Sequence, residues 1–256
     1  MLGIGGGGFM TVRIPPSGNG MQSKVFNIDF RETAPSLANQ SMFPPHSNLS
    51  QFGGLAVAVP GEIMGLSTAH RLWGSLPWED LFEPVVELAE ASQVGPEFAR
   101  RMPWFAPLLL GEEEWSSVFA PEGKLLTEND TIHRPAYAES LRTIAREGPS
   151  AFYNGSITRS LVNKIQSKGG IVTLEDFSNY TVNVTPALEG TFRGNKIYTT
   201  QAPTSGPVLL HMLNLVEMYD EEDSDSVLDA HRFVEIQKFG FAARCVNLTR
   251  PDNFQV

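Results

Sequence analysis

The chain has 256 residues, of which 41% are apolar and 19% charged, a balance typical of a globular protein rather than a disordered one. Its formal net charge of −10 argues against a general binder of nucleic-acid backbones, which needs a basic face. A single cysteine excludes a disulfide framework and a cysteine-cluster metal site. No run of about 18 apolar residues predicts a membrane span.

Acceptor triplets for N-glycosylation, of the form N-x-S/T, are unusually frequent. They occur at 7 of the 13 asparagines, whereas chance would give about two. The excess predicts a glycoprotein with a lumenal or extracellular history, and chance composition is the alternative. Residues 1–4 lack the basic and apolar segments of a signal peptide, so we expect the leader to be missing from this chain. The seven asparagines are Asn39, Asn48, Asn129, Asn154, Asn179, Asn183 and Asn247.

The beginning of the chain predicts two strands followed by a polar loop. Residues 9–14 follow a run of glycines and have the composition of a strand. Residues 25–31 alternate between apolar and polar side chains, which predicts a second strand with one apolar and one polar face. The polar face carries Asn27, Asp29 and Arg31.

The middle of the chain has the period of helices. One helix is predicted from Pro60 to a stop at Gly74, and a second from about Pro77, which suits a first helical turn. Further helical segments are predicted from Pro135 and over 157–165. In the second of these helices the residues expected to face inward are Leu81, Val85, Leu88 and Ala89.

The pattern then returns to short strands. Residues 173–176 have the spacing of a capping box, with aspartate in place of glutamate or glutamine. Residues 181–200 are expected to form two or three strands, with turns at Gly190 and at Gly194–Asn195.

Two more helices are predicted near the end, over 205–219 and 227–246, with the acidic segment 220–225 between them as a solvated loop. The order of elements is therefore strands, helices, strands and helices. This order predicts the α+β class, with layered sheets and helices outside them.

The sequence contains no clear motif for a cofactor or a metal ion. The run from Gly3 to Gly8 has the spacing of a dinucleotide fingerprint, but a strand follows it and no strand precedes it, so we expect no nucleotide and no other cofactor. No two of the five histidines have metal-ligand spacing, and Cys245 is interpreted as a small buried hydrophobe, so no metal site is expected. The residues alone reveal no nucleophile, since a G-x-S-x-G elbow is missing.

Arg31 is the charged residue with the clearest potential role. A guanidinium at the end of a rigid strand suits two-point capture of a carboxylate. The alternative is a local ion pair with Asp29 or Glu32. Spacing alone does not decide between them.

Seven short segments, taken together, resemble those of a known protein family. They are Gly3–Met10, Asp29–Pro35, Val57–Glu62, Gly74–Trp78, Ala151–Ser156, Gly169–Asp176 and Ala202–Pro207. Each is weak alone, but in this order, over essentially the whole chain, they resemble the gamma-glutamyltransferase (glutathione hydrolase) family.

This resemblance implies a partial N-terminal-nucleophile hydrolase fold, an αββα sandwich that is incomplete at both ends. Residues 1–256 would form a single incomplete domain, part of the large subunit of a precursor that cleaves itself. The new N-terminal threonine of the small subunit would attack the gamma-glutamyl amide, and water or an acceptor amino acid or peptide would resolve the acyl-enzyme. The implied partners are glutathione and other gamma-glutamyl compounds, these acceptors, and the small subunit of the same precursor; nucleic acid is not among them.

The resemblance also assigns roles to two residues. Arg31 matches the family's arginine that grips the α-carboxylate of the glutamyl group, and Glu32 would orient that arginine. The family's nucleophile lies in a Thr-Ser/Thr-His context, which neither Thr68-Ala69-His70 nor Thr199-Thr200-Gln201 matches. We therefore expect that this chain contains no catalytic residue, ends before the cleavage point, and is inactive alone.

Two further expectations concern compartment and alternative function. The parent enzyme is expected in the secretory pathway, at the extracellular face of the plasma membrane or in the vacuole. The alternative function is a non-catalytic binding or dimerising partner of intact subunits, because a missing half would leave unpaired sheet edges and an uncovered apolar face.

Overall fold

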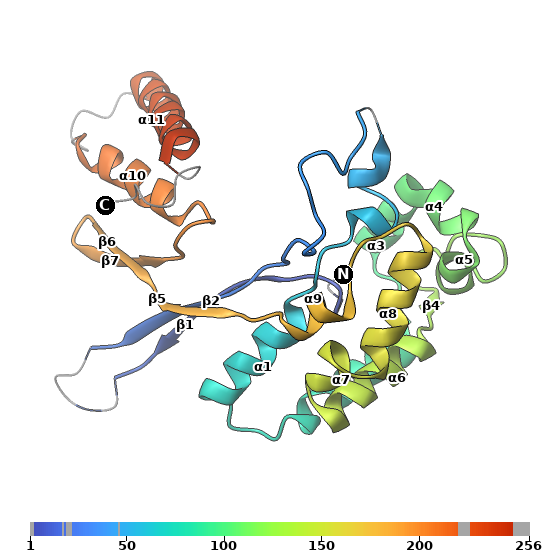
Figure 1. Cartoon of the computed structure of the whole chain (residues 1–256). Coiled ribbons are helices and arrows are strands. Elements are labelled where there is room, and N and C mark those ends of the chain that lie inside the picture. Colours follow the sequence, from blue (N-terminus) through green and yellow to red (C-terminus); the bar gives the residue numbers. More distant parts are fainter. Residues whose placement is uncertain (1–2, 17, 19–21, 46, 220–225, 248–256) are drawn as a thin grey trace. The chain divides into compact units, whose positions relative to one another are not determined.

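The chain divides into two compact units by its internal contacts. The sheet unit comprises residues 1–31 and 181–256, and the helical unit comprises residues 32–180. The predicted acidic loop at 220–225 lies outside the described residues. The computed structural model describes residues 3–16, 18, 22–45, 47–219 and 226–247 (Figure 1).

The sheet unit is built on a three-stranded antiparallel sheet. Strand β2 (Lys24–Phe30) lies between β1 (Gly8–Ile14) and β5 (Asn183–Pro186). The predicted strand is confirmed, and Ile28 and Phe30 are buried while Asp29 between them is only partly buried. The burial does not alternate over the whole strand, because Asn27 of the predicted polar face is also buried. The end of this central strand leads directly to Arg31.

A hairpin follows the sheet, formed by β6 (Leu188–Phe192) and β7 (Asn195–Thr199). Its turn contains Gly194, which has a positive φ of 77°, as the sequence predicts. The predicted turn at Gly190 is wrong: this glycine pairs with Ile197 inside the hairpin. A Cβ at Gly190 would lie 2.7 Å from Cδ2 of Leu210, so the glycine lets the neighbouring helix approach the strand.

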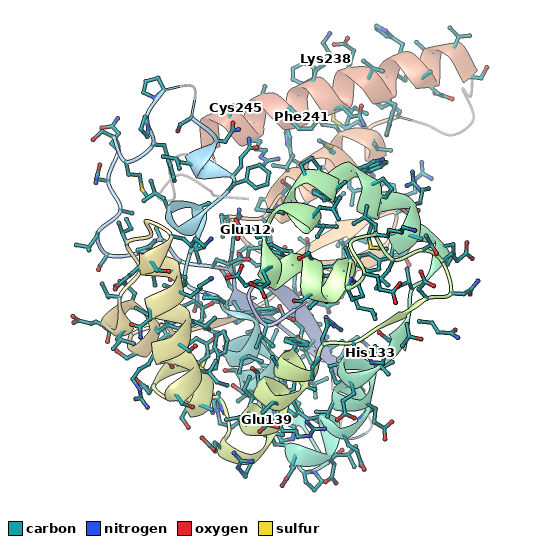
Figure 2. All side chains as sticks on the ribbon, turned by 90° about the vertical axis from the view of Figure 1, so that its right-hand side faces the viewer. Glu112, His133, Glu139, Lys238, Phe241 and Cys245 are labelled. Carbon is teal, nitrogen blue, oxygen red and sulfur yellow. The ribbon has the colours of Figure 1, made fainter. Side chains whose placement is uncertain are left out.

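Two helices complete the sheet unit, α10 (Gly206–Glu217) and α11 (Ser226–Asn247). Gly240 allows close packing between them, because a Cβ there would overlap the side chain of Met212. The expectation that Cys245 is buried is wrong, since this residue is exposed on α11 (Figure 2). The reason is that exposed apolar side chains on α11 alternate with charged ones, so an apolar position on this helix does not predict burial.

The helical unit contains the predicted helices α1 (Glu62–Trp73), which stops at Gly74, and α6 (Pro135–Glu147). Its other elements are mostly short. They are α2 (Glu83–Glu90), α3 (Pro96–Arg101), α4 (Ala106–Gly111), α5 (Glu113–Phe119), α7 (Ser150–Tyr153), α8 (Ser156–Ser167), α9 (Leu174–Ser178), and the two-residue strands β3 (Ser92–Gln93) and β4 (Thr131–Ile132).

The prediction for the second helix needs correction. Helix α2 begins at Glu83 rather than near Pro77, and Pro84 occupies its first turn. Ala89 is buried as predicted, and so is Val86. Leu81, Val85 and Leu88, which were also predicted to face inward, are exposed. The prediction failed at the three exposed positions because α2 packs against α6, and the buried side of α2 is the one that carries Val86 and Ala89.

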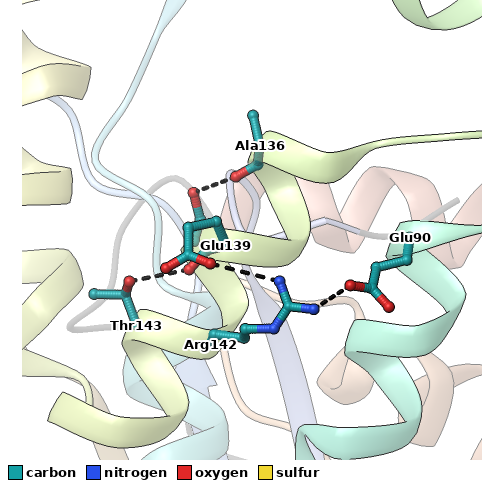
Figure 3. A network of polar contacts seen from close by, with 6 residues as sticks. Glu90, Ala136, Glu139, Arg142 and Thr143 are labelled. Carbon is teal, nitrogen blue, oxygen red and sulfur yellow. Dashed lines mark hydrogen bonds and ion pairs between the residues drawn. The ribbon is translucent and has the colours of Figure 1, made fainter.

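Polar contacts also connect α2 and α6. The guanidinium of Arg142 on α6 pairs with Glu90 of α2 and lies 3.5 Å from Glu139 within its own helix (Figure 3). Both ion pairs are exposed, so their contribution to stability is small. Burial of Ala138, Leu141 and Ile144 stabilises this pair of helices more.

The polar loop that precedes α1 is anchored by glycine. A Cβ at Gly54 would lie 2.6 Å from the backbone nitrogen of Gly170, which follows α8. The N–H of Gly54 donates a 3.2 Å hydrogen bond to the carbonyl of Lys168. Backbone therefore packs directly on backbone at this point, and the loop is held against the end of α8.

Candidate functional site

Arg31 immediately follows the last residue of β2, and its side chain is exposed. Its backbone N–H donates a 3.0 Å hydrogen bond to the carboxylate of Asp29. A side chain that accepts from the backbone two residues later fixes the local turn. The side chain of Arg31 therefore extends from a backbone position that is fixed at the end of the sheet.

A buried asparagine secures the same strand. Asn27 is 5% exposed, its amide oxygen accepts a 2.9 Å hydrogen bond from the Thr11 hydroxyl, and its amide nitrogen donates a 2.9 Å bond to the carbonyl of Thr199. These bonds satisfy a polar group that would otherwise be costly to bury. They connect β1 and the end of β7 to β2, the strand that leads to Arg31.

A small cavity lies on the polar face of the sheet. Its lining includes Asn27, Asp29, Asn183 and Thr200, and its volume is about 50 Å³. Pockets that bind small molecules usually have volumes of about 300–1,000 Å³, so this cavity is far too small for a glutamyl group. The cavity alone is therefore not a substrate pocket.

Glu32 is the first residue of the helical unit, and its side chain is exposed. The next residue, Thr33, forms an antiparallel bridge with Val59, with N–H···O distances of 3.2 and 2.9 Å. This bridge holds the segment after Glu32 beside the start of α1. Partial burial, and then the negative charge of Glu32, raise the pKa of Glu62 in the first turn of that helix.

The start of α1 is fixed by Tyr153, which the sequence did not single out as a functional residue. Its hydroxyl donates a 2.8 Å hydrogen bond to the carbonyl of Pro60 and accepts one of 3.2 Å from the N–H of Met64. The side chain is 2% exposed, and burial raises its pKa. Tyr153 falls within one of the seven family segments, which was the available signal.

A second polar anchor holds the segment that follows Glu32. Thr173 and Asp176 form the predicted capping box, in which the Asp176 carboxylate accepts 2.8 Å bonds from the N–H and the hydroxyl of Thr173. Its other oxygen accepts a 2.8 Å bond from the N–H of Ser36. One carboxylate thus connects the loop after Glu32 to α9.

The boundary between the two units passes between Arg31 and Glu32. These predicted binding residues are neighbours in the sequence, and the structure describes each within its own unit. Their roles in substrate binding remain predictions. Among the described residues, no group of three or more histidine, cysteine, aspartate or glutamate side chains could hold a metal ion.

Comparison with known proteins places the chain in a family. The sequence profile described as Gamma-glutamyltranspeptidase matches residues 1–256. The chain belongs to the gamma-glutamyltranspeptidase family. It is 41% identical over 254 residues to glutathione hydrolase proenzyme 1 of Schizosaccharomyces pombe, covering 95% of this chain and 39% of that relative. The chain spans about two fifths of the length of the curated gamma-glutamyltranspeptidase relatives it matches.

Solved gamma-glutamyltranspeptidase structures agree with the sequence match. The enzyme from Pseudomonas nitroreducens, complexed with L-DON, superimposes with a TM-score of 0.85 at 30% identity, covering 99% of this chain and 76% of that one. The Helicobacter pylori enzyme gives a TM-score of 0.89 at 27% identity, covering 99% and 74%. The predicted α+β class and partial N-terminal-nucleophile hydrolase fold are thereby confirmed.

None of the helices in the described part of the chain combines the length and apolar character needed to cross a bilayer.

Proposed function

We propose that this chain supplies the gamma-glutamyl-binding side of a glutathione hydrolase that also transfers glutamyl groups. The family match over residues 1–256 is the observation that carries the proposal. The position of Arg31 supports it, because an exposed guanidinium at the end of a buried strand can bind the substrate's α-carboxylate at two points. Glu32 would orient that guanidinium.

The proposed reaction is acyl transfer to a threonine outside these 256 residues. The threonine hydroxyl would attack the gamma-glutamyl carbonyl carbon, forming an ester and breaking the amide C–N bond. The α-amine of the same threonine would take the hydroxyl proton and deliver it to the leaving amine. Water, or the amine of an acceptor amino acid or peptide, would then cleave the ester and release the glutamyl group.

The remaining proposals concern partners and compartment. The relatives named as proenzymes support a precursor that is processed into subunits, so the partner of this chain would be the small subunit of the same precursor. The frequent glycosylation triplets support passage through the secretory pathway to the cell exterior or the vacuole.

The function can be tested by comparing the native protein, purified from its own host, with recombinant residues 1–256. We expect the native protein to release p-nitroaniline from gamma-glutamyl-p-nitroanilide, and the recombinant chain to release none. No release by the native protein would contradict the proposed reaction. Release by the recombinant chain would contradict an external nucleophile.

A further inference from the structure

The first turn of α1 has no cap from its own residues. Its N-cap is Gly61, which has no side chain to accept from the free N–H groups of that turn. The hydroxyl of Tyr153, on α7, accepts instead from the N–H of Met64 at 3.2 Å. Met64 is the third residue of the helix, whose N–H a serine or aspartate at the N-cap would normally bind. A side chain from another helix therefore caps α1.

The same hydroxyl separates two groups that could otherwise bond to each other. It donates a 2.8 Å hydrogen bond to the carbonyl of Pro60, so it bridges this carbonyl and the N–H of Met64. Pro60 and Met64 have the spacing of a helical hydrogen bond. Gly61 already has φ and ψ of −107° and −13°, in the helical region, so small rotations would close the direct bond if the hydroxyl were removed. Tyr153 thereby keeps α1 from starting earlier.

The position of this hydroxyl is itself fixed by packing. The ring of Tyr153 stacks on that of Tyr180, with 5.6 Å between centroids, and packs against Phe152 and Phe177. Burial raises the pKa of Tyr153, so at neutral pH the hydroxyl keeps the proton that it donates to Pro60. Tyr153→Phe would preserve the ring contacts and remove only the hydroxyl.

The start of α1 determines where the segment after Glu32 lies. Val59, directly before Pro60, forms the antiparallel bridge with Thr33, the residue that follows Glu32. A direct bond from Met64 to Pro60 would draw Pro60 toward the helix and pull Val59 with it, because the chain is continuous. The bridge would then shift or break, and Glu32 would move.

A second contact holds the other end of the same segment. The N–H of Ser36 donates a 2.8 Å hydrogen bond to the carboxylate of Asp176, which the capping box with Thr173 fixes at the start of α9. Residues 32–36 are therefore anchored at Thr33 and at Ser36. Both anchors come from the part of the helical unit that lies far along the chain.

We propose that Tyr153 and Asp176 are positioning residues for the gamma-glutamyl donor, which set the place of Glu32 and through it the orientation of Arg31. This inference rests on the proposed function, in which Glu32 orients the guanidinium that binds the α-carboxylate. Tyr153 is buried, so it acts on the donor only through this segment.

The test compares the native protein with its Tyr153→Phe variant in steady-state kinetics with gamma-glutamyl-p-nitroanilide. We expect KM for the donor to rise about tenfold and kcat to change by less than about twofold, because a displaced Glu32 weakens binding of the donor. Loss of folded protein would instead lower kcat at an unchanged KM. A donor KM that is unaltered in Tyr153→Phe overturns the role of Tyr153.

Tyr137→Phe is the matched control, because it removes the same atom in the same unit. Tyr137 lies on α6, and its hydroxyl makes no hydrogen bond to another described residue. Its donor KM should equal that of the unaltered protein, and a rise as large as in Tyr153→Phe would contradict a specific role.

Asp176→Ala removes the other anchor and leaves Tyr153 in place. It should also raise the donor KM, which keeps the proposal testable if Tyr153→Phe does not fold. An unaltered donor KM in Asp176→Ala overturns the role of Asp176.

A Glu32→Gln background tests the route of the effect. There, Tyr153→Phe should raise the donor KM no further, since both changes act through one contact, and additive effects would refute transmission through Glu32. Arg31→Ala separates the two proposals. If it leaves kcat/KM unchanged, the proposed function fails; if only Arg31→Ala affects the donor, this inference alone fails.

Discussion

At the residue scale, the position of Arg31 depends on its neighbours in β2. Asp29 accepts the Arg31 backbone N–H, and Asn27 fastens the strand to β1 and to the end of β7. The sequence predicted the strand and the polar face, since alternation is a local pattern. It could not predict the bond from Asn27 to Thr199, because that contact joins residues far apart along the chain.

Replacing Arg31 by alanine in the native protein should raise KM for a gamma-glutamyl donor. A charged hydrogen-bonded contact of about 2–3 kcal/mol corresponds to a loss of about 30-fold to 150-fold in kcat/KM. The kcat/KM of Arg31→Lys should lie between those of Arg31→Ala and the unaltered protein, because lysine keeps the positive charge but cannot form the two parallel hydrogen bonds of a guanidinium. Steady-state kinetics with gamma-glutamyl-p-nitroanilide measures kcat/KM of the unaltered protein and of both variants.

The matched control for this prediction is Arg13→Ala. Arg13 is an exposed arginine on β1, opposite Val25 and far along the sheet from Arg31. Its removal changes the net charge equally and should leave kcat/KM unchanged. An unaltered kcat/KM in the Arg31→Ala variant would refute the binding role.

At the scale of elements, the sequence predicts features that depend on neighbouring residues, and it does not predict contacts between distant segments. The capping box at Thr173 and Asp176 follows from four consecutive residues, and the structure confirms it. The hydrogen bonds of Tyr153 to Pro60 and Met64 join segments about ninety residues apart, which no periodicity reveals. The same limit explains Gly190, because a glycine in a strand and a glycine in a turn look alike locally.

Removing the Asp176 carboxylate should destabilise the protein. Asp176→Ala loses a capping box and the bond from Ser36, so we expect the free energy of unfolding to fall by about 1–2 kcal/mol in urea titrations at pH 7. The exposed neighbour Glu175 provides the control, and Glu175→Ala should change stability by no more than about 0.5 kcal/mol. Equal effects of the two substitutions would contradict the capping role.

The pH dependence of this difference has a defined sign. Burial opposes ionisation of Asp176, but its hydrogen bonds from Ser36 and Thr173 outweigh that and lower its pKa below the ordinary value of 3.8. The advantage over Asp176→Ala is therefore fully present above pH 3.8 and is lost as the pH falls through the lower folded-state pKa.

At the scale of the whole molecule, α11 has more apolar surface than α10 covers. Val227, Val234 and Phe241 lie seven residues apart and are 77%, 50% and 57% exposed, and Phe239 on another side of the helix is 62% exposed. Figure 2 labels Phe241 on this helix. Exposed apolar side chains gathered on one helix, beside charged residues such as Glu235 and Lys238, mark a surface that contacts a partner. We infer that this helix requires a partner, which the proposed function identifies as the small subunit.

Recombinant residues 1–256 should therefore self-associate when produced alone. We expect size-exclusion chromatography with light scattering to show species larger than a monomer, and the double substitution Phe239→Ser with Phe241→Ser to shift them toward the monomer. Lys238→Ser, on the same helix, should leave the distribution unchanged. A monodisperse monomer for the unaltered chain would contradict the prediction.

The contact between Gly54 and Gly170 limits which sequences can encode this molecule. Any side chain at either position would meet backbone atoms, which cannot rotate away as a side chain can. Gly95 and Gly111 face open space, so alanine or serine fits there without displacing other atoms. Positions 54 and 170 are thus closed to substitution for steric reasons alone, and the loop preceding α1 can diverge freely only between such fixed points.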